Sequence, residues 1–262
     1  MAMKKTSIIL AAALVCAASC SIKEDRVPCP CWLSIDLGGC SQKNVTVSAW
    51  SESEIFTERV AVQDYKDDGI YEKTVPKGLV RTSVISGERD MRRSGATLTI
   101  PAGHDADSIW AHASLVECAG EFARDTAVLR KQFARVFMSV ESPEGHSYPY
   151  RFIVRSNVSG MDMRDLSPVS GEFRKELKLD KDNICMFCLP RQEEDGGALR
   201  LLLLDGEEVV DELPLASWIS QMGYSWLRKD LEDIYIGVDY AKAEVSISIQ
   251  GWDEGCSFKV EI

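Results

Sequence analysis

Short runs in which apolar and polar residues alternate recur along the chain, and this pattern constrains the fold more than any other sequence feature. Residues 31–37 place apolar side chains at every second position, and residues 45–50, 234–238 and 245–249 repeat the pattern. Successive side chains of a β-strand point to opposite faces, so a period of two indicates a strand with one buried face. Many such short strands predict an all-β protein built as a sandwich or barrel.

Turn residues separate the runs at short intervals. Asp68-Gly69, Lys77-Gly78 and Asp205-Gly206 each interrupt the alternation, and the last pair joins residues 199–204 to 207–213 in a predicted hairpin. A boundary between two parts of the chain is expected within residues 130–143. The remaining predicted strands cover residues 54–62, 70–75, 80–85, 96–100, 108–116, 133–140, 148–158, 172–179, 184–189 and 258–262.

One segment has helical periodicity instead. Pro214 stands where an opening proline is tolerated, and Gly223 ends the segment. Apolar residues recur between them at the spacing i, i+3, i+4 and i+7, namely Leu215, Trp218, Ile219 and Met222. The stripe predicts a short helix that covers a sheet, in preference to a membrane or partner helix.

The first 19 residues have the three-part layout of a secretory signal. Lys4 and Lys5 precede an uncharged apolar run over residues 8–18, and small residues lead to Cys20. The run is too short to cross a hydrocarbon core, which takes about 20 residues. Small residues followed by cysteine resemble a lipobox, so residues 1–19 are predicted to be a lipoprotein signal peptide and Cys20 the lipidation site.

Two alternatives to lipidation at Cys20 stay open. Cys16 is a competing acceptor, although bulky Val15 occupies a position that needs a small residue. Ordinary cleavage near Ala18 would leave Cys20 as a plain thiol. If Cys20 is acylated, its lipid chains tether the protein to the membrane through residues 20–28, since stable anchoring takes about two chains. Glu24-Asp25 is either a surface-export signal or part of a solvated tether.

Net charge limits the partners of the mature protein. The chain has 30 basic and 41 acidic residues, and removal of Lys4 and Lys5 with the signal changes the net charge from −11 to −13. An acidic protein is repelled by nucleic acid and by anionic lipid, so neither is an expected partner.

Seven cysteines remain besides Cys20, and an oxidising export compartment favours pairing of some of them. Because seven is an odd number, at least one stays free or pairs outside the chain. Cys29 and Cys31 are not expected to pair with each other. The full set is Cys29, Cys31, Cys40, Cys118, Cys185, Cys188 and Cys256.

The segment Cys20–Leu37 resembles the N-terminus of the FimB-like anchor lipoproteins, in the fimbrillin-associated family of Bacteroidales type V fimbriae. The matching features are Cys20, Glu24-Asp25-Arg26, Cys29-Pro30-Cys31 and the alternation from Leu33 to Asp36. Residues 150–160 and 231–252 resemble strands of the family's second domain more loosely.

The resemblance implies two tandem transthyretin-like β-sandwiches, placed here at residues 29–135 and 136–262, with the short helix in the second. It further implies a non-enzymatic protein without cofactor, lipid-anchored in the outer membrane and exposed at the cell surface. Such a protein holds the base of a fimbria and ends stalk assembly by binding the last stalk subunit, a fimbrillin.

The sequence shows no catalytic or metal-binding motif. His104, His112 and His146 lack zinc-site spacing, and Cys185-Met-Phe-Cys188 lacks a second CxxC, so structural thiols or a disulfide are favoured there. The acidic stretches 193–195 and 230–233 lack the ligand spacing of a calcium loop. Asp107-Ser108-Ile109 and Asp125-Thr126-Ala127 resemble a Bacteroidetes O-glycosylation pattern, which makes Ser108 and Thr126 candidate acceptors.

Three functions are weighed. A fimbrial anchor is the leading interpretation, and donation of the strand Phe258–Ile262 to a stalk subunit is a further hypothesis. The alternative is a surface lipoprotein that binds glycans or other ligands, which predicts a cluster of exposed tryptophans. An exported hydrolase would need a carboxylate pair in a cleft. The tryptophans to test are Trp32, Trp50, Trp110, Trp218, Trp226 and Trp252.

Overall fold

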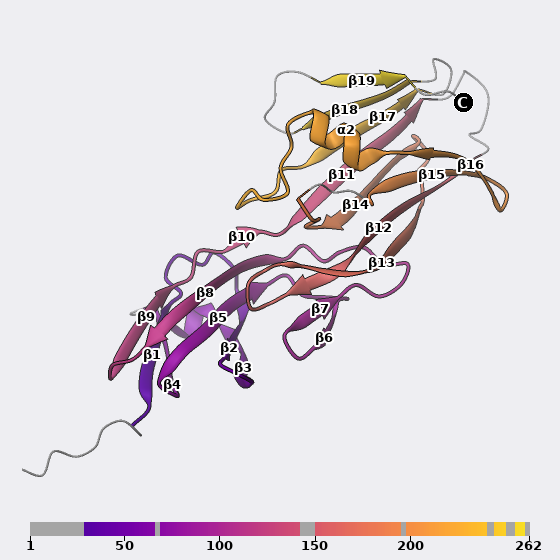
Figure 1. Ribbon diagram of the computed structural model, residues 1–262. Coiled ribbons are helices and arrows are strands. Elements are labelled where there is room, and N and C mark those ends of the chain that lie inside the picture. Colours follow the sequence, from indigo (N-terminus) through magenta and orange to yellow (C-terminus); the bar gives the residue numbers. More distant parts are fainter. Residues whose placement is uncertain are drawn as a thin grey trace, which may run out of the picture.

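A computed structural model describes residues 29–65, 69–141, 150–194, 198–239, 244–249 and 255–259, and most of these residues are in strands (Figure 1). The N-terminal half contains two sheets. The three-stranded sheet has the order β4-β1-β9 and consists of β1 (Cys31–Asp36), β4 (Ile70–Val75) and β9 (Phe122–Thr126). The five-stranded sheet has the order β10-β8-β5-β2-β3 and consists of β2 (Asn44–Trp50), β3 (Glu54–Ala61), β5 (Gly78–Ser86), β8 (Trp110–Cys118) and β10 (Arg130–Lys131).

The alternation along β1 explains how these two sheets pack. Cys31, Leu33 and Ile35 are fully buried, whereas Trp32 between them is half exposed. The three buried side chains join Val47 of β2, Val84 of β5 and others in one apolar cluster between the sheets. This is the two-layer packing of a β-sandwich. A short 3₁₀ turn, η1 (Val62–Tyr65), follows β3.

The C-terminal half also contains two sheets. One has the order β14-β11-β17-β18-β19 and consists of β11 (Phe133–Glu141), β14 (Ile184–Pro190), β17 (Ile234–Asp239), β18 (Glu244–Ile249) and β19 (Cys256–Lys259). The other has the order β16-β15-β12-β7-β6, with β13 (Pro168–Leu177) also paired to β12. Its other strands are β6 (Arg92–Ser94), β7 (Thr97–Thr99), β12 (Arg151–Asp162), β15 (Arg200–Asp205) and β16 (Glu208–Leu213).

The hairpin β6–β7 comes from the first half of the chain but pairs with the second. Leu98 of β7 lies opposite Met161 of β12 in an antiparallel register. Both side chains are buried in a small cluster with Trp50 and Ile85 from the N-terminal sheet. The expected boundary at 135/136 falls inside β11, so the division into residues 29–135 and 136–262 stays a prediction.

The helix α2 (Leu215–Gln221) covers the core of the second half, as its periodicity predicts (Figure 1). Leu215 and Ile219 are fully buried, and Gly223 follows the helix with a positive φ of 77°. No described helix is long and apolar enough to cross a membrane. The predicted class, all-β with sandwich packing and a short helix in the second half, is confirmed.

The strands that bear the two ends of the described chain lie far apart. Strand β1 begins at one end of the elongated molecule, and β17, β18 and β19 lie at the other end (Figure 1). The connection through β10 and β11 runs from one half to the other. A tether attached before β1 would therefore leave the sheet of β19 at the distal end.

Candidate functional site

The predicted lipidation residue Cys20 and the predicted tether 20–28 lie outside the described residues, so the first feature to describe is the strand that follows them in the chain. Strand β1 is central in its sheet, antiparallel to β4 and parallel to β9. The Trp32 amide donates to the carbonyl of Glu121 at 2.8 Å, and the Leu37 amide donates to that of Gly69 at 2.7 Å. Strand β1 is thus hydrogen-bonded into its sheet on both sides.

Strand β19 forms the opposite edge of the molecule. It pairs with β18, and the ring of Phe258 stacks on Trp218 of α2 with centroids 5.0 Å apart and planes within 11°. Residues 260–262 lie outside the described residues, so the hypothesis that residues 258–262 are donated rests on β19 alone. At the other edge of this sheet, Ile184 and Met186 of β14 are about half exposed.

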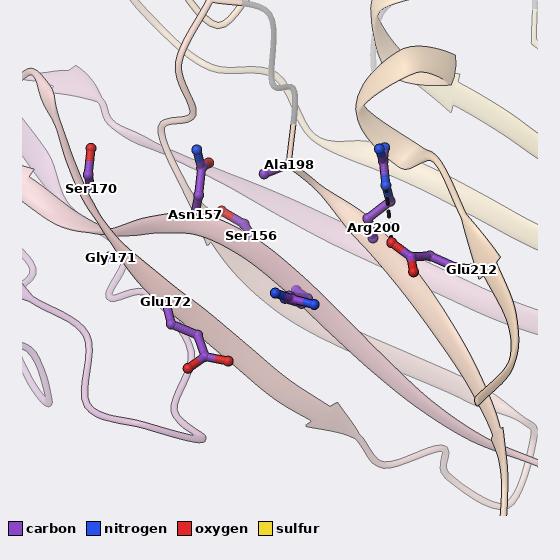
Figure 2. Close-up of a pocket in the computed structure, with 9 residues that line it drawn as sticks. Ser156, Asn157, Ser170, Gly171, Glu172, Ala198, Arg200 and Glu212 are labelled. Carbon is purple, nitrogen blue, oxygen red and sulfur yellow. Dashed lines mark ion pairs between the residues drawn. The ribbon is translucent and has the colours of Figure 1, made fainter. Parts of the chain in front are cut away.

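A groove with a volume of about 640 Å³ lies over β12, β13 and the β15–β16 hairpin (Figure 2). Figure 2 shows Glu172 on one side, Asn157 and Ser170 on the other, and Arg200 joined to Glu212. The Arg200 Nε lies 3.3 Å from a Glu212 carboxylate oxygen. None of the nine lining residues is aromatic, so the groove offers no aromatic stacking surface for sugars.

A polar cluster between β5, β8 and β9 contains the elements of a nucleophile–base pair but not their geometry. Asp125 accepts hydrogen bonds from Ser114 and Thr82, each at 2.6 Å, and lies 3.2 Å from His112 Nε2. Because Ser114 donates to the carboxylate and not to the imidazole, the histidine has no hydroxyl to deprotonate.

The electrostatics of this cluster are those of a structural carboxylate. Burial alone would raise the pKa of Asp125, but the hydrogen bonds from His112, Ser114 and Thr82 outweigh it and hold the pKa well below the usual value. His112 lies in the predicted strand 108–116, and the structure places it within β8. The sequence signal that could have indicated this cluster is Asp125, a charged residue on the partly buried face of β9.

The acidic stretch 230–233, which was considered for calcium, forms ion pairs with basic side chains. Asp230 accepts from Arg130 at 3.0 Å, and Arg228 binds Glu232 at 2.5 Å. Asp233 is buried and pairs with Lys131 and Arg135. In the described segments, no three acidic, histidine or cysteine side chains are grouped so that they could hold a metal ion.

The cysteines of the described residues are all free thiols in the structure, although pairing of some was expected. Cys185 and Cys188 are both buried on β14, and burial raises the pKa of Cys185 to about 11. Burial likewise raises the pKa of Cys188. Thiols of this kind are poor nucleophiles, which favours a structural role over redox work.

The tryptophans do not form the exposed cluster that sugar binding predicts. Trp50 and Trp226 are buried, and Trp110 and Trp218 pack against the core. Trp32 is 48% exposed, with the exposed Phe122 opposite it on β9. Trp252 lies outside the described residues, so five of the six can be placed.

Both predicted glycosylation patterns contain an aspartate with a structural contact. Asp107 is buried and accepts backbone hydrogen bonds from Arg89 and Met91 at 2.7 and 2.9 Å. Thr126 is exposed at the end of β9, and Ser108 is partly buried. Glycosylation of Ser108 and Thr126 stays a prediction.

Comparison with solved structures relates this arrangement to known proteins. The fimbrial anchor protein Mfa2 from Porphyromonas gingivalis matches with a TM-score of 0.60 and 16% sequence identity, over 86% of this chain and 98% of that chain. The chain has the fold of the Mfa2 anchor protein. The predicted resemblance to fimbrial anchor proteins is confirmed at the level of the fold.

Other solved structures share the Mfa2 fold. A proposed polysaccharide-binding protein from Bacteroides thetaiotaomicron matches with a TM-score of 0.62 and 13% identity, over 88% of this chain and 98% of that chain. A proposed adhesin from Bacteroides ovatus gives a TM-score of 0.56 and 12% identity, over 90% and 97%. No protein-family model and no curated protein matches the chain by sequence.

Proposed function

We propose that the protein is a non-enzymatic lipoprotein of the outer membrane that anchors the base of a fimbria at the cell surface. In this proposal Cys20 carries the lipid, and contact with the last fimbrillin subunit of the stalk ends stalk assembly. The observation that carries the proposal is the fold, which is shared with a fimbrial anchor protein over 86% of this chain and 98% of that chain.

The positions of the strands support this role. Membrane attachment requires a tether that enters a well-paired strand, and β1 is paired on both sides. An edge strand at the distal end is suited to stalk binding, because it offers unpaired N–H and C=O groups to a partner. Among the described residues, β14 and β19 each pair with one strand only, so the distal sheet has an edge on either side.

The lipid is tested by Cys20→Ser, with Cys16→Ser as the matched control in the same signal segment. We expect the Cys20→Ser protein to lose labelling by radioactive palmitate, to leave the detergent phase on Triton X-114 partitioning, and to release fimbriae into the medium. The control should behave as the wild type. Unchanged partitioning and attachment of the Cys20→Ser protein would overturn the anchoring proposal.

Stalk binding is tested by affinity capture of fimbriae with tagged variants. Deletion of residues 258–262 should abolish capture if β19 is the binding edge, and Met186→Asp should abolish it if β14 is. Glu207→Ala is the control, because Glu207 lies on the exposed β15–β16 turn with a side chain 95% exposed. Circular dichroism checks that each variant is folded. Full capture by both edge variants contradicts stalk binding through the distal sheet.

A further inference from the structure

We propose that Cys31 and Cys118 are joined by a disulfide bond in the exported protein, and that this bond fastens β1 to β8. Cys31 is the first residue of β1, and Cys118 is the last residue of β8. Both side chains have no exposed surface, and both belong to the apolar cluster between the two N-terminal sheets.

The strand register brings the two cysteines together. Cys31 lies opposite Val75 at the end of β4, and Cys118 lies opposite Gly78 at the start of β5. Only residues 76 and 77 separate these two partners. The amide of Trp32 donates to the carbonyl of Glu121, just after Cys118, which fixes the neighbouring backbones as well.

The Cys31 thiol also affects the pKa of Cys118. Burial first, and then the charge of Cys31 and hydrogen bonding to its side chain, raise the pKa of Cys118 to about 12. A thiol with so high a pKa is almost never a thiolate at neutral pH, so it reacts slowly once the sandwich has closed. The bond therefore has to form during folding, before the pair is buried.

The two cysteines of β14 cannot form a disulfide with each other. Cys185 and Cys188 are three residues apart on β14, which separates their Cα atoms by about 10 Å, beyond the reach of a disulfide at about 7 Å. Cys29 is exposed whereas Cys31 is buried. The pairing of Cys31 with Cys118 leaves an odd number of free thiols, as the count of seven requires.

The oxidation is a thiol–disulfide exchange with a disulfide oxidoreductase of the export compartment. The thiolate of one cysteine attacks the disulfide of the oxidant, and a mixed disulfide forms while one oxidant thiol leaves. The second cysteine then attacks the mixed disulfide and releases the other oxidant thiol. The protein thus loses two electrons and two protons, and the oxidant becomes a dithiol.

The position of this bond has a mechanical consequence, which rests on the proposed anchoring function. Tension between a membrane tether and a stalk enters the folded chain at the start of β1. Without the bond, the backbone hydrogen bonds of β1 to β4 and β9 carry that tension alone. With the bond, the load passes at Cys31 into β8, which lies inside the five-stranded sheet.

The bond is tested first by mass spectrometry of the exported wild-type protein, denatured and alkylated without reductant. We expect a peptide pair linked through Cys31 and Cys118, and loss of that pair in Cys118→Ser. In Cys185→Ser, the matched control on β14, the linked pair should persist. Alkylation of both cysteines in the wild type, or linkage of either to another cysteine, overturns the proposal. The measurement on the wild type does not depend on whether any variant folds.

Single-molecule pulling between the N- and C-termini tests the mechanical consequence. The bond removes the 87 residue-to-residue steps between Cys31 and Cys118 (118 minus 31) from the extended length, or about 310 Å at about 3.6 Å per step. Reductant should restore this length in the wild type and leave Cys118→Ser unchanged. Equal extension of the wild type with and without reductant overturns the inference. Neither measurement involves membrane or fimbriae, so its failure is distinct from failure of the Cys20→Ser test.

Discussion

Lys131 and Asp233 form a buried ion pair at the junction between the two halves of the chain. The Lys131 ammonium on β10 donates to one carboxylate oxygen of Asp233, and Arg135 lies 3.1 Å from the other. The side chains of Lys131 and Asp233 are 10% and 3% exposed. Two bases from the connecting segment therefore share one acid that immediately precedes β17.

Asp233→Ala should destabilise the protein by about 3–5 kcal/mol, because removal of one partner leaves Lys131 buried without a counter-charge. Urea unfolding followed by tryptophan fluorescence measures the loss. Glu207→Ala is the control: its partner Arg151 lies 2.9 Å away at an exposed position, where an ion pair contributes about 0–1 kcal/mol. If both substitutions lowered the free energy of unfolding equally, the buried pair would stabilise the protein no more than the exposed pair does.

The free energy of unfolding should decrease at acidic pH, because Asp125 becomes protonated. Its pKa is lower in the folded protein than in the unfolded chain, so the stabilisation is complete above the unfolded value of about 3.9 and is lost as pH falls below it towards the folded value. Asp125→Asn removes this dependence. We expect the gap in urea midpoint between the wild type and this variant to be constant from pH 7 to 5 and to narrow below about pH 4. A gap that widens in acid contradicts the assignment.

Gly160→Ala should detach the β6–β7 hairpin from β12. A Cβ at Gly160 would overlap the carbonyl oxygen of Leu98, which is backbone and cannot move aside as a side chain can. Faster amide hydrogen exchange across residues 97–99 would report the loss of pairing. Gly120→Ala is the matched control, since the nearest atom to its Cβ would lie at 3.7 Å, an ordinary contact. Equal exchange in both variants would refute the prediction.

Phe258→Ala should loosen β19 without unfolding the core. The Phe258 ring stacks on Trp218, and such a pair contributes about 0.5–1.5 kcal/mol beyond its buried area. Faster hydrogen exchange is expected in residues 256–259, with protection retained in β11 and β17. Phe258→Trp keeps an aromatic ring at this position and should restore protection. If the protection of β19 is unaffected by Phe258→Ala, its pairing with β18 alone suffices.

Period-two alternation predicted most strands because it reports which face is buried. The hairpin through Asp205-Gly206 is confirmed, with Gly206 at a φ of 58°. The strands β6, β9 and β10 were missed: β6 and β10 have only three and two residues, and β9 reads as a charged loop. Their pairing depends on partners distant in sequence, which no local pattern encodes.

The polar contacts were less predictable than the strands. The sequence does not indicate that Asp125 forms hydrogen bonds with His112 and two hydroxyl groups, or that Lys131 pairs with Asp233. These contacts follow from the register of strands that are distant in sequence. The acidic stretch 230–233 was visible, but the partners Arg130 and Lys131 of Asp230 and Asp233 lie about 100 residues earlier. The prediction that Cys20 is the lipidation residue, by contrast, rests entirely on a local pattern.

The pairing of β7 with β12 also bears on how the chain is made. Residues 97–99 are synthesised well before their partners at 160–162, so this short strand has no neighbour on that side until the second half has been synthesised. A polypeptide cut at residue 135 would keep such an open strand edge permanently, and open edges are templates for aggregation. The two halves therefore fold together. The first half completes its strand pairing only after the second half has been synthesised.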